Sequence, residues 1–340
     1  MKIIVDDRIP FIRGEIERLA EEVIYLPGAS IGREDVRDAD ILVVRTRTHC
    51  NRELLEGSSV GFIVTATIGY DHIDTEYCDG AGIKWTNCPG CNARSVCQYV
   101  SNVLQLLKAD LEGCTVGVVG VGHVGSLVAG LAAKSGCRLL LNDPPLEESG
   151  KGYGDGGCFA SLDEICEKAD IITFHTPLTR TGKYPTFHLA DRLFFSKLAR
   201  RPIIINASRG GVVDEAALKD AIRQGTVSHA AIDTWENEPR IDSELLDMVD
   251  VATPHVAGYS ANGKLNATLM SLKAVRDYIV SKGLSGTDLQ SVEFNISLPD
   301  APFLSAETLA EDCSLLKENS DGFECFRGNY PVRIEVPSLI

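Results

Sequence analysis

One short stretch of the chain, residues 115–126, constrains the fold more than any other part. An apolar run leads into a cluster of glycines, a helix-like segment follows, and a second apolar run ends at Asp143. Such glycines also occur where helices pack against sheets, so the cluster alone is weak evidence. The full order of strand, glycine turn, helix, strand and acid indicates a dinucleotide site, in which backbone N–H groups meet a pyrophosphate at a helix N-terminus. The expected contacts are Gly120, Gly122, His123, Val124 and Gly125.

The acid at the end of the second run favours NAD as the cofactor. A carboxylate at this position accepts hydrogen bonds from a ribose diol and repels the 2′-phosphate that distinguishes NADP. Asp143 is followed by Pro144 and Pro145, so no arginine stands where that phosphate would lie. We therefore expect NAD, with Asp143 among its ligands.

The composition limits the classes of partner. A chain of 340 residues is long enough for two or three domains. The formal net charge of −15 argues against a nucleic acid or an anionic membrane surface as a partner. An anionic substrate must therefore be held by local Arg or Lys side chains. The most apolar region, residues 116–133, is interrupted by glycines and a histidine, which argues against a membrane span.

The cysteines indicate a reducing compartment. The 11 cysteines show no disulfide framework, and the N-terminal residues form a charged strand pattern rather than a signal peptide. Reduced thiols in the cytoplasm fit best. Cys88 and Cys91 have the spacing of a redox or zinc pair, but no second pair or histidine cluster accompanies them. We expect two incidental thiols and no metal.

Apolar runs alternate with helical segments along most of the chain, which predicts an α/β fold. The first strands are expected at residues 2–5, 41–44, 62–65 and 83–85. A long helix over residues 92–110 should begin at the N-cap Asn92 and lead into the glycine motif. Four more strands are expected at residues 171–174, 203–205, 229–232 and 249–252, and long helical character returns at residues 260–282. With the two strands that flank the glycine turn, these four make a six-stranded, doubly wound parallel (Rossmann) sheet.

Polar residues follow consecutive strands of this sheet, at the edge where open α/β sheets bind ligands. They are Thr176 after the third strand, Ala207, Ser208 and Arg209 after the fourth, Asp233 and Glu238 after the fifth, and His255, Gly258 and Tyr259 after the sixth. Each alone has an ordinary structural explanation, such as a capped core histidine, a solvated acid or a surface ion pair. Because they converge beside a dinucleotide site, a purely structural set is the weaker interpretation.

The residue types suit the oxidation of a 2-hydroxy acid. His255 can take the hydroxyl proton, because imidazole titrates near neutrality. Glu238 would orient the ring and stabilise its protonated form. Arg209 can bind a carboxylate and polarise a forming carbonyl. Asp233 and Thr176 are placed to contact the nicotinamide side of the cofactor.

These motifs, in this order, resemble the D-2-hydroxyacid dehydrogenase superfamily over roughly residues 1–285. The motifs are Gly120-x-Gly-x-x-Gly125 with Asp143, His175-Thr-Pro-Leu178, Asn206-Ala-Ser-Arg-Gly210, Asp233-x-x-x-x-Glu-Pro239 and Pro254-His-Val-Ala-Gly258. The resemblance implies that Arg209, Glu238 and His255 are catalytic, with His255 as the proton acceptor. It implies NAD contacts from Asp143, Thr176, Ala207, Ser208, Arg209, Asp233 and Gly258.

The same resemblance implies a domain plan. A flavodoxin-like substrate domain would comprise residues 1–93 and 257–284, and the NAD domain residues 94–256. Residues 285–340 would form a small α+β dimerisation domain, shortened here, of a homodimer. The pattern Phe323-x-x-x-Arg327-x-Asn-Tyr330-x-x-Arg333 resembles part of that domain. Arg333 would then reach the active site of the partner subunit as an additional cation.

Further motifs are similar to one branch of the superfamily, which oxidises 4-phospho-D-erythronate to 3-hydroxy-2-oxo-4-phosphooxybutanoate on the route to pyridoxal 5′-phosphate. They are Met1-Lys-Ile-Ile-Val-Asp-Asp7, Val44-Arg-Thr46, Thr65-Ala-Thr-Ile-Gly-x-Asp-His-Ile-Asp74, Pro89-Gly-Cys-Asn-Ala93, His188-Leu-Ala-Asp191 and His255-Val-Ala-Gly-Tyr259. The similarity implies that Thr46, Thr67 and Tyr259 bind the substrate, a small phosphorylated 2-hydroxy acid.

The phosphate of such a substrate needs cations, and Arg45 and Arg47 follow a predicted strand end. Two solvated arginines beyond an edge strand are the ordinary alternative. That alternative is weakened because Thr46 and Thr67 close neighbouring strands and would face the same cleft. We therefore expect Arg45 and Arg47 to hold the phosphate.

Two other functions stay open. The first is another dehydrogenase of the superfamily, acting on phosphoglycerate, hydroxypyruvate or glyoxylate. The second is a non-catalytic NAD-sensing corepressor built on the same fold. The complete set of Arg209, Glu238 and His255 disfavours the second, as does the lack of an extra basic tail.

Overall fold

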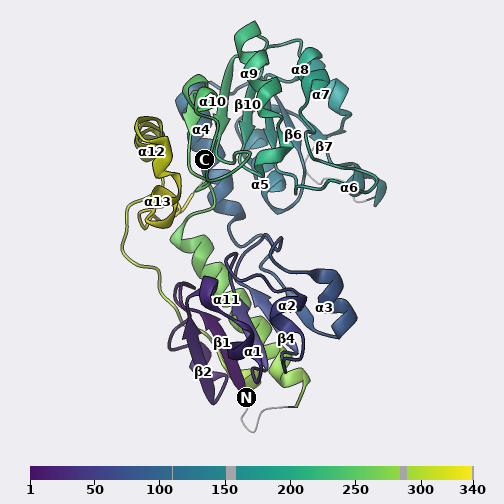
Figure 1. Cartoon of the computed structure of the whole chain (residues 1–340). Helices are drawn as coiled ribbons and strands as arrows, with labels where there is room; N and C mark the ends of the chain where they lie inside the picture. The colour runs from purple at the N-terminus through teal and green to yellow at the C-terminus, as the bar shows by residue number, and fades with distance from the viewer. Residues whose placement is uncertain (109, 151–157, 284–288, 339–340) are drawn as a thin grey trace. The chain divides into compact units, whose positions relative to one another are not determined.

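The computed structural model describes residues 1–108, 110–150, 158–283 and 289–338. These residues divide into two compact units. One unit contains residues 1–92 and 261–300, and the other contains residues 93–260 and the chain from Ala301 on. Figure 1 labels the helices and strands of both units.

The first unit is built on a five-stranded parallel sheet in the order β2-β1-β3-β4-β5. Its strands are β1 (Lys2–Asp6), β2 (Glu22–Leu26), β3 (Ile41–Val44), β4 (Phe62–Thr65) and β5 (Lys84–Thr86). This order is that of flavodoxin-like sheets. The sequence patterns identify β1, β3, β4 and β5. They miss β2, because this strand is only partly buried and begins with a charged residue.

Helices cover both faces of this sheet, which explains why its strands are continuous apolar runs. The long helix α11 (Ala261–Ser281) packs Leu272, Val275 and Ile279 against alternate residues of β1, β3 and β4. Side chains of α1 (Arg33–Val36), α2 (Arg52–Leu55) and α3 (Thr75–Ala81) cover the opposite face. Cys88 and Cys91 are free, buried thiols of this unit. Burial raises the pKa of the Cys91 thiol to about 12, so it is not a reactive thiolate at neutral pH.

The second unit contains a seven-stranded parallel sheet in the order β12-β11-β10-β9-β6-β7-β8. Its strands are β6 (Thr115–Val119), β7 (Arg138–Asn142), β8 (Cys158–Phe159), β9 (Ile171–Phe174), β10 (Ile203–Asn206), β11 (His229–Ile232) and β12 (Val251–Ala252). The strand order reverses between β6 and β9, as it does at the ligand site of doubly wound folds. The doubly wound sheet is therefore confirmed. The prediction of six strands was one short, because the two-residue strand β8 is too brief to show a pattern.

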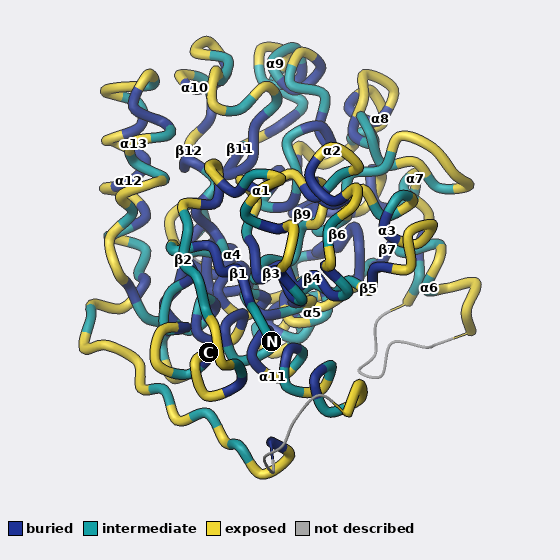
Figure 2. Tube along the Cα trace, turned by 60° about the horizontal axis from the view of Figure 1, so that its bottom comes forward, coloured by how far each residue is buried: buried dark blue, intermediate teal, exposed yellow. Residues whose placement is uncertain are grey.

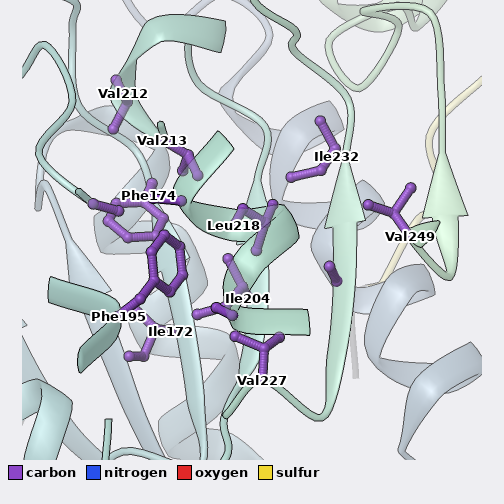
Figure 3. Close-up of a cluster of buried hydrophobic side chains, with 14 of the residues drawn as sticks. Ile172, Phe174, Phe195, Ile204, Val212, Val213, Leu218, Val227, Ile232 and Val249 are labelled. Carbon is purple, nitrogen blue, oxygen red and sulfur yellow. The ribbon is translucent and has the colours of Figure 1, made fainter. Parts of the chain in front are cut away.

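Each face of the second sheet buries its own core. On one face, α4 (Ala93–Leu107) and α5 (His123–Lys134) pack against alternate residues of the central strands. On the other face, Ile172, Phe174 and Ile204 meet side chains from α7 (Leu162–Lys168), α8 (Arg192–Ser196), α9 (Glu215–Gln224) and α10 (Ser243–Met248). Figure 3 shows this second cluster, with Leu218 and Val227 beside Ile204.

The C-terminal segment is divided between the two units. The short helix η4 (Leu289–Ser291) belongs to the first unit, whereas α12 (Ala306–Glu318) and α13 (Phe323–Gly328) belong to the second. Buried side chains of the last two helices, among them Leu316 and Phe323, join the core of the second unit. Along α12, buried residues are interleaved with exposed ones in Figure 2, as expected for a helix that lies on a surface. A role of residues 285–340 in dimerisation stays a prediction.

None of the helices in the described part of the chain combines the length and the apolar character needed to cross a membrane.

Candidate active site

The glycine turn lies at the carboxyl end of β6, beside the point where the strand order reverses. Gly120 has a φ of +88°, and a Cβ at this position would lie 2.7 Å from the carbonyl carbon and oxygen of His175. A Cβ on Gly125 would lie 1.9 Å from the carbonyl oxygen of Gly120. Both positions therefore require glycine. Gly122 is the N-cap of α5, and no heavy atom of another part of the chain lies within 4 Å of where its Cβ would stand.

The turn fits a bound dinucleotide. The first N–H groups of α5 have no partners within the helix, so its N-terminus attracts a pyrophosphate. Beside it, the Oγ1 atom of Thr176 is buried and has no hydrogen-bond partner among the described residues. A hydroxyl in that state is ready to bond a ligand. The residues present therefore suit the cofactor that the sequence predicts.

Asp143 follows β7 and ties the glycine turn to the next helix. Its carboxylate accepts the Val121 N–H at 2.9 Å and the Leu146 N–H at 3.0 Å, and so caps α6 (Pro144–Glu148). Each carboxylate oxygen retains a lone pair after accepting one bond. Asp143 is thus held beside the turn with the capacity to accept hydrogen bonds from a ribose.

His255 and Glu238 form a hydrogen-bonded pair. The Nδ1 atom of His255 lies 2.9 Å from Oε2 and 3.1 Å from Oε1 of Glu238. Burial opposes ionisation of Glu238, but the hydrogen bond and charge of His255, together with the Trp235 N–H, hold the pKa of the carboxyl below its ordinary value. An ionised Glu238 accepts the proton on Nδ1 and leaves Nε2 as the basic nitrogen of the neutral ring. This is the arrangement of a general base.

The backbone around His255 is held in an unusual conformation. His255 has a φ of 57°, in the left-handed region that few residues other than glycine adopt. Asp233 stabilises this turn, because its buried carboxylate accepts the Val256 N–H at 2.7 Å, the Ala257 N–H at 3.1 Å and the Thr253 hydroxyl at 2.7 Å. Strained backbone held in this way is common at active sites. Asp233 therefore anchors the loop that carries the base, and its contact with NAD stays a prediction.

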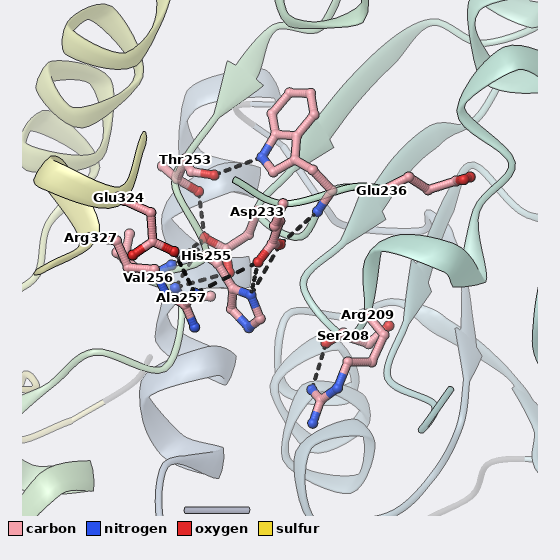
Figure 4. Close-up of polar contacts among 12 residues, drawn as sticks. Ser208, Arg209, Asp233, Glu236, Thr253, His255, Val256, Ala257, Glu324 and Arg327 are labelled. Carbon is pink, nitrogen blue, oxygen red and sulfur yellow. Dashed lines mark hydrogen bonds and ion pairs between the residues drawn. The ribbon is translucent and has the colours of Figure 1, made fainter. Parts of the chain in front are cut away.

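Arg209 stands at the end of β10, next to β11 in the sheet. The side chain of Asn206 donates to the Arg209 carbonyl at 3.0 Å, and its oxygen accepts the Ser208 hydroxyl at 2.9 Å. Gly210 is closely packed, since a Cβ there would lie 1.9 Å from the Trp235 carbonyl oxygen. The turn is therefore rigid. Figure 4 shows Arg209 and His255, which follow β10 and β12, the strands on either side of β11.

The predicted substrate residues Arg45, Thr46, Arg47 and Thr67 lie in the first unit. Arg45 and Thr67 follow the neighbouring strands β3 and β4, and the Thr67 hydroxyl lies 2.7 Å from that of Thr65. The sequence patterns missed Lys264 of α11. Burial lowers the pKa of its ammonium group, and the charge of Arg45 lowers that pKa further. A single lysine in a long helix carries no signal in the sequence that it lies beside an arginine more than two hundred positions earlier.

Two arginines of the C-terminal segment differ from expectation. Arg333, expected as a cation for the partner's site, is only 7% exposed and pairs with Asp312 of its own chain at 2.6 Å. This correction follows from packing, since a buried arginine needs a buried acid. Arg327 instead reaches the predicted site. Its Nη1 lies 3.8 Å from Oε2 of Glu238, and its Nε donates to the Tyr259 hydroxyl at 3.2 Å.

The comparisons with known proteins agree with this geometry. Residues 94–257 match the family model described as D-isomer specific 2-hydroxyacid dehydrogenase, NAD binding domain. The erythronate-4-phosphate dehydrogenase of Bacteroides thetaiotaomicron is 50% identical over 98% of this chain and 97% of its own length. That of Bacteroides fragilis is 48% identical over the same shares. That of Shigella flexneri is 44% identical over 82% of this chain and 74% of its own length.

Solved structures agree on the fold. A D-lactate dehydrogenase from Aquifex aeolicus, in complex with NAD and lactic acid, superposes with a TM-score of 0.68 at 25% identity. The superposition covers 88% of this chain and 100% of that one. A D-2-hydroxyisocaproate dehydrogenase superposes with a TM-score of 0.68 at 22% identity, over 84% and 99% of the two chains.

Proposed function

Because the chain belongs to the erythronate-4-phosphate dehydrogenases, within the D-isomer specific 2-hydroxyacid dehydrogenase family, we propose that it oxidises 4-phospho-D-erythronate with NAD. The product is 3-hydroxy-2-oxo-4-phosphooxybutanoate, an intermediate on the route to pyridoxal 5′-phosphate. The observation that carries the proposal is the His255–Glu238 pair, since a relative of this family that lacked it would have no base for the hydroxyl proton.

The reaction needs a proton acceptor and a group that holds the substrate carboxylate. Bound NAD would supply the hydride acceptor for C2 of the substrate. Nε2 of His255 takes the C2 hydroxyl proton, and the ionised Glu238 stabilises the imidazolium that results. Arg209, which follows β10, binds the substrate carboxylate and polarises the forming carbonyl. These roles correspond to the three residue types at the ends of β10, β11 and β12.

The cofactor would be held by the glycine turn and its neighbours. Backbone N–H groups of residues 122–125 would bond the pyrophosphate, and Asp143 the adenosine ribose. Thr176, with its buried and unpaired hydroxyl, would bond the nicotinamide half. The support for this assignment is the close fit of Gly120 against residues 175–176, which brings the turn and Thr176 together.

The phosphate of the substrate would bind in the first unit. Arg45 and Lys264 are two cations close enough for Arg45 to lower the pKa of Lys264, in a protein whose net charge is −15. Arg47 follows on the same loop, and Thr46 and Thr67 would add hydroxyl donors. A phosphate dianion compensates such adjacent positive charges, which is why this cluster suits a phosphorylated substrate.

A homodimer in the cytoplasm completes the proposal. It rests on the resemblance to the family and on free cysteines throughout the described chain. Sedimentation analysis of the purified protein would give the number of subunits. A mass of 36.8 kDa at all concentrations would show a monomer.

The experiment that tests the reaction is identification of its product. Purified protein would be incubated with 4-phospho-D-erythronate and NAD, in the presence of a carbonyl-trapping reagent that draws the equilibrium forward. We expect NADH and the trapped 2-oxo acid in equal amounts by absorbance and mass spectrometry. NADH without the 2-oxo product, or no reaction, would contradict the proposal.

A further inference from the structure

The C-terminal helix α13 carries a cation into the site. Phe323, at the start of this helix, is fully buried in the core of the second unit. One turn later, Arg327 extends toward the loop after β12 that holds His255 and Val256 (Figure 4). Its side chain is 25% exposed, and that of Glu238 is 18% exposed. An ion pair that is shielded to this extent is coupled more strongly than a solvated surface pair.

Arg327 contacts two separate groups. Its Nη1 lies 3.8 Å from Oε2 of Glu238, the same oxygen that accepts the hydrogen bond from His255. Its Nε donates to the hydroxyl of Tyr259, at 3.2 Å. Burial opposes the charge of Arg327, but Tyr259, to which it donates a hydrogen bond, and the charge of Glu238 hold the pKa of Arg327 above its ordinary value. One side chain therefore joins the orienting acid to the tyrosine that follows the catalytic loop.

We propose that Arg327 is a positioning residue with two roles. It holds the Glu238 carboxylate against His255, and it orients the Tyr259 hydroxyl toward the substrate. The part that concerns Tyr259 rests on the proposed function. The part that concerns Glu238 is a property of the free protein. In this arrangement the C-terminal segment completes the active site of its own chain.

An alternative is a structural ion pair, in which Arg327 only attaches α13 to the body of the unit. Glu324 offers such a pair within the helix, with its Oε1 also 3.8 Å from Nη1 of Arg327. The alternative does not account for the hydrogen bond to Tyr259. It also predicts no change in the titration of His255 when Arg327 is replaced, and this difference separates the two.

The direction of that titration change follows from the charges around His255. The ionised Glu238 favours the imidazolium and Arg327 disfavours it, while burial raises the pKa of Asp233, the other acid beside His255. Glu324 and Tyr259 face Arg327 from its other sides. Among these groups, removing the guanidinium leaves no cation to oppose the charge of Glu238. His255 should then hold its proton to higher pH than in the unchanged protein.

Three variants test the proposal. Arg327→Gln removes the positive charge. Arg327→Lys keeps the charge but replaces the guanidinium and its several N–H donors with a single ammonium group. Arg240→Gln is the matched control, because it also removes one arginine charge. Arg240 is exposed and lies two positions after Glu238. Histidine NMR titration of each free protein, with the His255 signal assigned from His255→Asn, reads the coupling without substrate. Steady-state kinetics with 4-phospho-D-erythronate over pH give kcat and KM.

The expected pattern has three parts. In Arg327→Gln, the titration of His255 moves to higher pH, the acidic limb of the kcat profile moves with it, and KM rises severalfold. In Arg327→Lys the titration stays near that of the unchanged protein, while KM still rises because the bond to Tyr259 is lost. Arg240→Gln matches the unchanged protein in all three measurements.

An unshifted His255 titration in folded Arg327→Gln would overturn the proposal and leave a structural ion pair. If Arg327→Gln does not fold, Arg327→Lys decides, since a KM equal to that of the unchanged protein contradicts the role at Tyr259. A protein with shifted titration but no activity on this substrate would retain the role at Glu238 and refute the proposed function instead.

Discussion

The Nδ1 atom of His255 lies 2.9 Å from Oε2 of Glu238, and this contact decides which ring nitrogen works as the base. The contact joins the loop after β11 to the loop after β12, two neighbouring strands of one sheet. The Glu238 carboxylate therefore takes part in proton transfer indirectly, by orienting the His255 ring. The contact also makes the pair sensitive to any change in the charge of Glu238.

Replacing Glu238 with glutamine should therefore move the pH dependence. Glu238→Gln keeps the shape of the side chain but loses the charge that favours the imidazolium. We expect the acidic limb of the kcat/KM profile to move to lower pH, with a reduced maximum. The profile would be measured over pH with 4-phospho-D-erythronate and NAD. An unchanged profile would mean that the carboxylate and the base are not coupled.

The carboxylate of Asp143 should give preference for NAD over NADP. It lies beside the glycine turn through its bond with the Val121 N–H, where a 2′-phosphate would meet its negative charge. We expect kcat/KM with NAD to exceed that with NADP at least tenfold. Asp143→Asn, which retains one acceptor oxygen, should lower the ratio of kcat/KM with NAD to kcat/KM with NADP. Comparable efficiencies with the two cofactors in the unchanged protein would refute this assignment.

The cations of the first unit should act on the phosphate of the substrate. Hydrogen bonds to charged groups contribute roughly 1.5–3 kcal/mol each. Arg45→Ala and Lys264→Met should thus each raise KM for 4-phospho-D-erythronate about tenfold or more. An unphosphorylated 2-hydroxy acid should be affected little.

The matched control for these variants is Arg37→Ala. Arg37 is an exposed arginine of the same unit, in an ion pair with Glu34. Its loss should leave both substrates unaffected. An equal loss for phosphorylated and unphosphorylated substrates in Arg45→Ala would place the phosphate elsewhere.

Glu215 should make the stability of the protein depend on pH. Burial raises the pKa of this carboxyl from 4.5 to about 7, with Glu236 and Asp242 adding to the effect. Below pH 4.5 the group is protonated in both the folded and unfolded states. As pH rises from 4.5 to about 7 only the unfolded state ionises, so the free energy of unfolding falls.

Glu215→Gln should remove this loss. We expect the variant to be more stable than the unchanged protein at pH 8, by up to about 3 kcal/mol, and equally stable near pH 4. Urea unfolding at both values of pH gives the difference. Glu167→Gln, at an exposed position of α7, is the control and should show no such dependence. Equal stabilities of Glu215→Gln and the unchanged protein at pH 8 would contradict the account.

The sequence predicts those features that depend on local pattern. Continuous apolar runs mark the buried parallel strands such as β10, because both faces of such a strand are covered. The motifs that place Arg209, Glu238 and His255 at strand ends are equally local. The edge strand β2 is only partly buried and has no such pattern.

Contacts made across the fold are not visible in the sequence. Lys264 lies in a segment without a chemical motif, and the pattern that contains Arg327 gives no sign of its partner, so only folding brings these residues to Arg45 and Glu238. Arg333 shows the converse, since a motif suggested an exposed cation and the fold buries it against Asp312. In each case the position of the side chain depends on a partner far away in the chain.

The measurement that tests the central claim most directly is the ratio of kcat/KM for 4-phospho-D-erythronate to that for 3-phosphoglycerate, with NAD and the purified protein. His255→Ala serves as the negative control, and its turnover should fall at least about a hundredfold. We predict a ratio of about a hundred or more, because the chain is 50% identical to an erythronate-4-phosphate dehydrogenase over 98% of its length. Equal efficiencies, or a preference for 3-phosphoglycerate, would contradict the account.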